Sequence, residues 1–164
     1  MGKLKTNSPV IIDCTGSNIG CIHPANGDNQ QLNSSQKKAL FLDDFRIPKD
    51  VLQYHEDAGH LVLYDILNWD VVKSYTEFVQ FIKLNGLPDI ISFDHDLHQE
   101  HYSPLMFDEA SYNALYKTFK EKTGFDAAKW LMRYIKRNKI SQPIIYCHSR
   151  NPTGKKNILS LFNY

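Results

Sequence analysis

The sequence places side chains that can transfer protons or bind a metal ion at the ends of three short apolar runs. Asp43 and Asp44 follow the run 39–42, Asp94, His95 and Asp96 follow the run 90–93, and His148 and Ser149 follow the run 144–147. Imidazole titrates near neutral pH, and clustered carboxylates bind divalent cations through oxygen. Aspartate is also a favoured turn residue, so the central motif alone is equally consistent with a simple chain reversal.

Each apolar run has the composition of a short buried strand. A strand covered on both faces in a parallel sheet is apolar almost throughout. The second strand of such a sheet has two candidates, 61–67 and 69–72, and we favour 69–72 because it leads directly to a helix cap at Ser74. A weak helix is expected to start at Pro48 and to end at Gly59.

Helix caps mark two strong helices between these strands. Ser74 with Glu77, and Thr123 with Asp126, have the spacing of an N-terminal cap, and apolar residues recur at helical spacing after each. Alternating strands and helices predict an α/β fold, namely a flavodoxin-like or receiver-like three-layer domain with a parallel sheet of about four main strands. If the first, third and fourth strands are neighbours, their ends meet in one crevice at the carboxyl edge of the sheet.

The composition excludes several classes of protein. A chain of 164 residues with 42% hydrophobic and 23% charged residues fits one soluble domain. A formal net charge of +1 argues against a surface for duplex DNA. Three cysteines without metal-type spacing, together with the lack of a signal peptide or a membrane-spanning stretch, predict a cytoplasmic protein with no membrane partner.

The amino-terminal segment differs from the rest of the chain. The runs 10–13 and 19–23 flank the turn residues TGSN and predict a small hairpin, whereas 24–36 lacks apolar periodicity and has the composition of a linker. We therefore expect an amino-terminal hairpin and linker over 1–36 and an α/β domain over 37–164. The hairpin could add an edge strand to its own sheet, or to a second copy and so form a homo-oligomer.

Four segments together resemble a known family. They are LFLDDFRIP, ISFDHDL, TGFDAAKWL and HSRNPTGKKN, which stand in this order between residues 38 and 160. The chain resembles the cyclic-phosphate-processing receiver-like family, an offshoot of the receiver domains of response regulators. The resemblance implies a receiver-like sheet and a role in processing cyclic phosphate ends of RNA or nucleotides. A phosphorelay domain also needs a lysine at the end of a fifth strand, and here the last apolar run is the fourth.

The resemblance and the chemistry of phosphodiester cleavage assign roles to the residues at the strand ends. His95 and His148 are expected to act as acid and base from the rim of the crevice, with Asp94 and Asp96 completing the catalytic set; Arg46, Ser149 and Asn151 would bind the phosphate. Asp43, Asp44 and Asp94 would hold Mg²⁺ in a metal-dependent version, and no other cofactor is expected. Tyr102, Tyr112 and Tyr116 could stack on a base, although such a helical stripe is more often core.

The sequence leaves two functions open. The first is a hydrolase or phosphodiesterase that acts on a cyclic phosphate of a nucleotide or RNA end. The alternative is a catalytically silent receiver-like module that binds a nucleotide or a protein partner in the same crevice. The pocket walls decide the substrate, and RNA ends, cyclic dinucleotides and cyclic products related to ADP-ribose all remain open.

Overall fold

The computed structural model describes residues 37–54, 58–103, 105 and 108–162. The hairpin and linker expected over 1–36 lie outside the described residues, so they and the domain boundary near Lys37 stay predictions. In chain order the elements are β1 (Ala39–Leu42), α1 (Pro48–Val51), α2 (Ala58–Ile66), β2 (Trp69–Val72), α3 (Tyr75–Asn85), β3 (Ile90–Phe93), the 3₁₀ helix η1 (Gln99–His101), α4 (Glu109–Tyr116), α5 (Gly124–Asn138), β4 (Ile144–Cys147) and α6 (Pro152–Ser160). No described helix is both long and apolar enough to cross a membrane.

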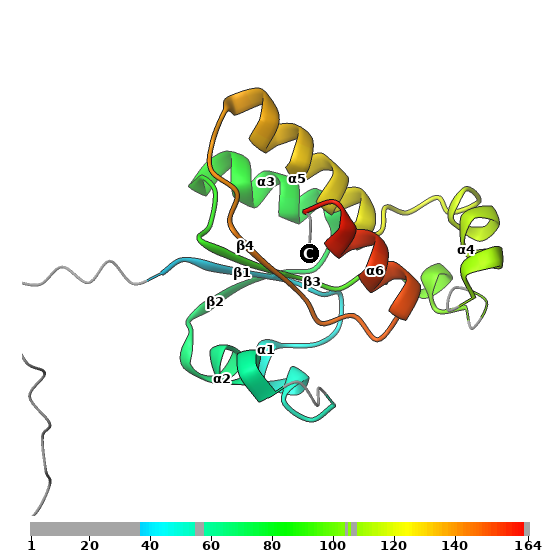
Figure 1. The fold of residues 1–164 in the computed structure, drawn as a ribbon, viewed down its shortest axis with the longest axis horizontal. Helices are drawn as coiled ribbons and strands as arrows, with labels where there is room; N and C mark the ends of the chain where they lie inside the picture. The colour runs from blue at the N-terminus through cyan, green and yellow to red at the C-terminus, as the bar shows by residue number, and fades with distance from the viewer. Residues whose placement is uncertain (1–36, 55–57, 104, 106–107, 163–164) are drawn as a thin grey trace, which may run out of the picture. The chain divides into compact units, whose positions relative to one another are not determined.

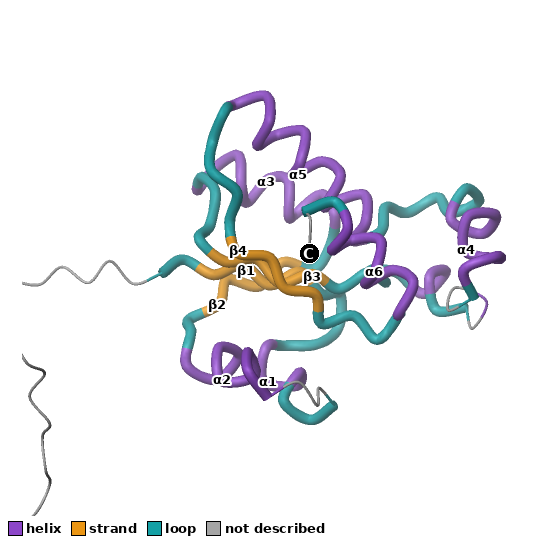
Figure 2. Tube along the Cα trace, viewed as in Figure 1, coloured by secondary structure: helices purple, strands orange, loops and turns teal. Residues whose placement is uncertain are grey.

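The four strands form one parallel sheet in the order β2-β1-β3-β4. Helices α1 and α2 cover one face of this sheet, and α3 and α5 cover the other (Figure 1). Figure 2 shows the strands as a central layer between the helices. The predicted receiver-like α/β fold with four parallel strands is confirmed.

Two local expectations along the first crossover have different outcomes. The preference for a strand at 69–72 is confirmed, and the alternative strand 61–67 is wrong, because most of that stretch belongs to α2. Within this helix Tyr64 is buried whereas Val62 and Ile66 are exposed, a pattern that follows helical and not strand periodicity. Gly59 does not end a helix and instead lies within α2.

The strands divide the core because successive side chains point to opposite faces of a sheet. Leu40, Leu42, Ile91 and Phe93 belong to the large core under α3, α5 and α6. Phe41 belongs to a smaller core with side chains of α1 and α2. The two layers bury β1 and β3 completely, which fixes where the carboxyl ends of these two strands lie.

The caps that the sequence predicts hold the helices of the large core. The Oγ of Ser74 accepts a hydrogen bond from the Glu77 backbone N–H at 3.2 Å at the start of α3. A capping box of Thr123 and Asp126 starts α5. Substituting such caps typically costs about 1 kcal/mol of stability, so these short motifs position whole helices against the sheet.

The strand register aligns the carboxyl ends of β1, β3 and β4, so the residues that follow them lie side by side. Leu42 is paired with Phe93, and Phe93 with Cys147. The ladder continues for one more residue, since the Asp94 N–H donates to the Leu42 carbonyl at 2.8 Å and the His148 N–H to the Phe93 carbonyl at 3.0 Å. The chain order reverses between β1 and β3, which is the place where open α/β sheets bind ligands.

Candidate active site at the carboxyl edge of the sheet

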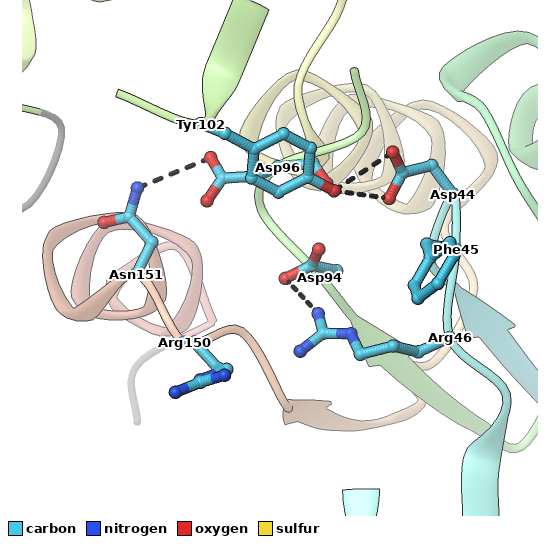
Figure 3. A pocket seen from close by; sticks show the side chains of 8 residues that line it. All are labelled: Asp44, Phe45, Arg46, Asp94, Asp96, Tyr102, Arg150 and Asn151. Atoms are coloured by element: carbon cyan, nitrogen blue, oxygen red, sulfur yellow. Dashed lines mark hydrogen bonds and ion pairs between the residues drawn. The ribbon is translucent and has the colours of Figure 1, made fainter. Parts of the chain in front are cut away.

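A pocket of about 660 Å³ opens beyond the ends of β1, β3 and β4. Its walls are Asp44, Phe45 and Arg46 after β1, Asp94 and Asp96 after β3, Tyr102 after η1, and Arg150 and Asn151 after β4 (Figure 3). Pockets of this size accommodate small-molecule ligands. The expectation that the strand ends converge on one crevice therefore holds for these side chains.

Asp43 organises the turn that follows β1. Its Oδ1 accepts hydrogen bonds from the backbone N–H groups of Phe45, at 2.9 Å, and of Arg46, at 2.6 Å. Its Oδ2 accepts from Arg46 Nε at 2.6 Å and lies 3.1 Å from His148 Nε2. Burial raises the pKa of Asp43, but the hydrogen bonds from His148 and from the Arg46 backbone outweigh this effect and lower the pKa to about 2. Asp43 therefore remains a carboxylate that holds the turn in place.

Arg46 joins the first and third strand ends through its guanidinium group. Besides its bond to Asp43, its Nη2 lies 2.9 Å from Asp94 Oδ1. Burial by itself lowers the pKa of Arg46, but the charges of Asp94 and Asp43 outweigh this effect and raise the pKa above its usual value. The guanidinium also lies over the ring of Tyr54, with its central carbon 5.3 Å from the ring centroid. A permanent cation is thus fixed at the floor of the pocket.

Asp94 is the carboxyl group whose protonation is most altered. Burial raises its pKa, the charge of Arg46 opposes the rise, and the charges of Asp43 and Asp96 add to it, which gives a pKa of about 7. A group with such a pKa can accept and return a proton near neutral pH. Figure 3 shows its carboxylate in the pocket beside the guanidinium of Arg46.

Asp44 lies at the pocket wall opposite a tyrosine. The hydroxyl of Tyr102 donates to its Oδ1 at 2.9 Å and to its Oδ2 at 3.1 Å. Burial raises the pKa of Asp44, the hydrogen bond from Tyr102 lowers it, and the charge of Asp43 raises it; the net change is upward. The β1 loop is thereby tied to the loop after η1.

His148 does not lie at the rim, where the sequence analysis placed it. Its side chain is 0% exposed and stacks on Phe41 with ring centroids 4.1 Å apart. Its Nδ1 is 2.6 Å from Ser92 Oγ, which in turn is 2.7 Å from the Tyr64 hydroxyl. Both ring nitrogens are engaged with protein groups, Nε2 with Asp43. The expectation of a rim position is wrong because the aromatic layer under α2 takes up the ring.

His95 is buried as well, on the opposite side of the sheet edge. Its Nδ1 is 2.6 Å from Asp96 Oδ1, and its Nε2 is 2.8 Å from the hydroxyl of Tyr112 on α4. A Cβ at Gly154 of α6 would lie 2.4 Å from its Cγ, so α6 packs directly on the imidazole. The expected rim position is wrong here too, and the acid–base role of both histidines stays a prediction.

The two expected phosphate donors that follow His148 have mainly protein partners. Asn151 caps α6, since its Oδ1 accepts from the Gly154 N–H at 2.9 Å. Its Nδ2 is 3.4 Å from Asp96 Oδ1, and the side chain lines the pocket. Ser149 accepts a hydrogen bond from the Asn151 N–H at 3.2 Å, and its hydrogen bond to Asp94 lowers the pKa of that carboxyl group. Asn151 is therefore within reach of a ligand, whereas Ser149 supports Asp94.

Asp43, Asp44 and Asp94 form an acidic group that could hold a metal ion, as the sequence analysis expected. Each offers a carboxylate oxygen, and these atoms lie within 4.8 Å of one another. Hard cations such as Mg²⁺ prefer oxygen ligands of this kind. Both oxygens of Asp43 accept hydrogen bonds, both oxygens of Asp44 accept from Tyr102, and Asp94 is paired with Arg46, so an ion would share these oxygens with the groups that already bind them.

A comparison with protein families matches residues 38–164 to the cyclic-phosphate processing receiver domain. The chain belongs to this family. Searches of curated proteins and of solved structures find no match. The expected resemblance is thus confirmed over the part of the chain that carries the sheet and the pocket.

This receiver domain differs from a phosphorelay receiver at its carboxyl end. After β4 the described chain continues into α6, and both Lys155 and Lys156 lie on that helix. The ammonium group of Lys156 is 3.0 Å from Glu109 Oε1 of α4, and both side chains of this ion pair are largely exposed. Neither lysine follows a fifth strand in the described chain, which agrees with the departure noted in the sequence.

Sequence reasoning missed two residues of the pocket in this receiver domain. Arg150 is exposed, and its guanidinium carbon lies 5.7 Å from the centroid of the Tyr54 ring. Phe45 is 86% exposed beside Asp44. The sequence did offer a signal for both: Phe45 stands between Asp44 and Arg46, and Arg150 stands directly before Asn151. Among the tyrosines proposed for stacking, Tyr102 lines the pocket, whereas Tyr112 is buried and stacks on Tyr116 with centroids 5.8 Å apart.

Proposed function

We propose that this receiver domain hydrolyses a cyclic phosphate of a nucleotide or RNA end in the pocket at the carboxyl edge of its sheet. The observation that carries the proposal is the meeting of Asp94 with two arginines at the reversal of strand order. Family membership supports the same chemistry. In the reaction the oxygen of water forms a bond to phosphorus, a ribose oxygen leaves with a proton, and the product is a phosphomonoester.

Arg46 and Arg150 supply the positive charge for the phosphoryl oxygens. Guanidinium groups bind phosphate through paired N–H donors, and both of these groups line the pocket. Arg46 is held by Asp43 and Asp94, so its position is fixed before the ligand arrives. Fixed donors aimed at developing charge are the largest source of catalysis in many enzymes.

Asp94 is the proposed proton acceptor. It faces the pocket and lies 2.9 Å from Arg46, so a phosphate bound by the arginine would lie beside the carboxylate. Asp94 can take a proton from the attacking water and return it to the leaving oxygen. Its pKa of about 7, raised chiefly by burial, suits both steps. The two imidazoles then act as positioning residues: His148 through Asp43, and His95 through Asp96.

The charge balance of the pocket favours Mg²⁺ as a cofactor. Asp43, Asp44, Asp94 and Asp96 contribute four carboxyl groups against two guanidinium groups, from Arg46 and Arg150. A phosphate anion would be repelled by this excess of negative charge. Asp44 and Asp94 would hold the ion, which would neutralise a phosphoryl oxygen. A bound ion would lower the pKa of Asp94, so in this metal-dependent version Asp94 is a ligand, and it is the proton acceptor only in the metal-free version. Tyr102 orients Asp44 for that task.

The experiment that tests the function uses a panel of substrates. The purified full chain would be incubated with cyclic mononucleotides, cyclic oligonucleotides and RNA that ends in a 2′,3′-cyclic phosphate, with Mg²⁺ or with a chelator, and the products would be resolved by mass. We expect the gain of one water on one substrate class and a loss of that activity in the chelator. Activity that resists the chelator would contradict the proposed need for Mg²⁺ but would still support the hydrolase function.

The alternative is a binding module without catalysis. The observation that favours it is the burial of both histidines, because all four of their ring nitrogens contact protein groups. Such a module would bind the same ligands through Arg46 and Arg150. Calorimetry that shows nucleotide binding, with no product under either condition of the panel, would favour this alternative over the hydrolase.

A further inference from the structure

We infer that Phe45 is the surface on which the base of the nucleotide stacks, and that this residue sets the preference of the pocket for substrates with a base. The inference rests on the proposed function, since it concerns the part of the same ligand that lies beyond the phosphate. No role for Phe45 follows from the motifs in the sequence. Its position in the structure supplies one.

Phe45 is an apolar side chain left in water at the mouth of a charged pocket. It is 86% exposed and lines the pocket between Asp44 and Arg46. Burying a phenylalanine stabilises a protein, and this exposed ring contributes almost nothing of that kind to the fold. An aromatic ring that adjoins a phosphate-binding group instead offers a π-face to a ligand.

The backbone under Phe45 is fixed by the site itself. The N–H of Phe45 donates to Asp43 Oδ1 at 2.9 Å, and the next N–H, of Arg46, donates to the same oxygen at 2.6 Å. The carboxylate that holds the phosphate-binding arginine therefore also holds the aromatic residue before it. Because the backbone is already fixed, only the side chain of Phe45 has to be ordered when a ligand binds, and this favours affinity.

The dimensions and charges of the pocket indicate what occupies the remaining space. A pocket of about 660 Å³ exceeds the needs of a phosphate group alone. In Figure 3 the rings of Phe45 and Tyr102 lie beside Asp44, whereas Arg150 lies on another side of Asp94. The Tyr102 ring is 55% exposed and its hydroxyl is bound to Asp44, so it forms a second fixed aromatic wall. A nucleotide with its phosphate at the arginines and its base at Phe45 would match this separation of the charged and aromatic parts of the pocket.

The control for this inference is a second exposed apolar residue. Exposed apolar side chains are common on folded proteins and need no function. Leu84 on α3 is 83% exposed and is not part of this pocket. Leu84→Ala therefore removes a comparable exposed side chain without touching the proposed platform.

The test compares two substrates with four proteins. The substrates are adenosine 2′,3′-cyclic phosphate and ribose 2,3-cyclic phosphate, which lacks the base. The proteins are the full wild-type chain, Phe45→Ala, Phe45→Trp and Leu84→Ala, and KM and kcat are measured for each pair. We expect Phe45→Ala to raise KM for the nucleotide about 5- to 150-fold with kcat nearly unchanged. Phe45→Trp and Leu84→Ala should retain the wild-type KM or lower it, and KM for the base-free substrate should not respond to Phe45.

Two results would overturn the inference while the hydrolase function stands. One is an unchanged KM for the nucleotide in Phe45→Ala, and the other is an equal rise in KM for both substrates. If no protein turns over either substrate, calorimetry with adenosine 2′-monophosphate separates the two proposals. Binding that Phe45→Ala weakens then keeps the inference without the hydrolase, and binding that Phe45→Ala leaves unchanged rejects the inference too.

Discussion

Asp94 and His95 are neighbours in the sequence, yet they occupy different environments. Asp94 faces the pocket, and its pKa is raised to about 7, chiefly by burial. His95 is turned away and has both ring nitrogens bound to Asp96 and Tyr112. Asp43 and Asp44 divide in the same way, since Asp43 is fully buried and Asp44 lines the pocket.

This contrast separates two kinds of functional residue. Groups that face a ligand tend to have perturbed pKa values because they are desolvated beside other charges. Buried polar groups beneath them are instead paired with partners in the protein, as His148 is with Ser92 and Asp43. Substitutions in the first kind should change activity, and substitutions in the second should change stability first.

The largest expected effect is on activity, at Asp94. Asp94→Asn retains the shape of the side chain but cannot accept a proton, so kcat should fall about 100- to 10,000-fold. Circular dichroism and thermal melting should show an intact fold, because the amide oxygen can still accept from Arg46 and Asp43 still balances the charge of that arginine. The matched control is Asp70→Asn, which alters an exposed aspartate on β2. If Asp94→Asn keeps the wild-type kcat, the proton acceptor must be another carboxylate.

The next effect is on stability, at His148. His148→Ala removes the ring that stacks on Phe41 and leaves Asp43 and Ser92 each without one buried partner. The free energy of unfolding in urea should fall by about 3 to 5 kcal/mol. His98→Ala, at an exposed histidine, should change it by less than about 0.5 kcal/mol. A small loss of stability with a large loss of kcat would instead mean that this imidazole reaches the substrate.

These two environments mark the limit of what the sequence predicts. The apolar runs and the caps follow from local patterns, and the strand order is assumed from a flavodoxin-like fold, so the fold and the meeting of the strand ends could be predicted. The direction of a side chain beyond the end of a strand depends on distant contacts. His148 bonds to Asp43 across 105 residues of sequence, and no local pattern reports that contact.

Helix α2, in the first crossover, shows the same limit for local structure. The stretch 61–67 is apolar enough for either a strand or a helix, and a glycine at 59 usually weakens a helix. Packing of Tyr64 against Phe41 and Trp69 decides for the helix. Tertiary contacts therefore outweigh the local preference in this stretch, as they do at His148 and His95.

A smaller effect is expected where α6 packs on the buried imidazole. An alanine is normally better than glycine inside a helix by about 1 kcal/mol, but a Cβ at Gly154 would lie 2.4 Å from Cγ of His95. Gly154→Ala should therefore lower stability by about 1 to 3 kcal/mol. In a double-mutant cycle, His95→Ala removes the two ring atoms that the new methyl group meets but keeps Cβ, 2.8 Å from it, so it should relieve part of this loss, as measured by urea unfolding. Additive losses in the cycle would show that the imidazole is not what the new methyl group meets.

The smallest expected effect concerns helix α4, which reaches the site through the buried imidazole of His95. The hydroxyl of Tyr112 lies 2.8 Å from Nε2 of His95, and Nδ1 of that ring holds Asp96 at the pocket. Tyr112→Phe removes one buried hydrogen bond and should lower the free energy of unfolding by about 0.5 to 1.5 kcal/mol. Because the ring is still held by Asp96 and by α6, kcat/KM should fall by less than about tenfold, far less than for Asp94→Asn. Urea unfolding and steady-state kinetics on the same preparations measure both effects. A fall in kcat as deep as that of Asp94→Asn, with stability unchanged, would place the Tyr112 hydroxyl in the reaction itself and would end the division between pocket residues and the buried residues that support them.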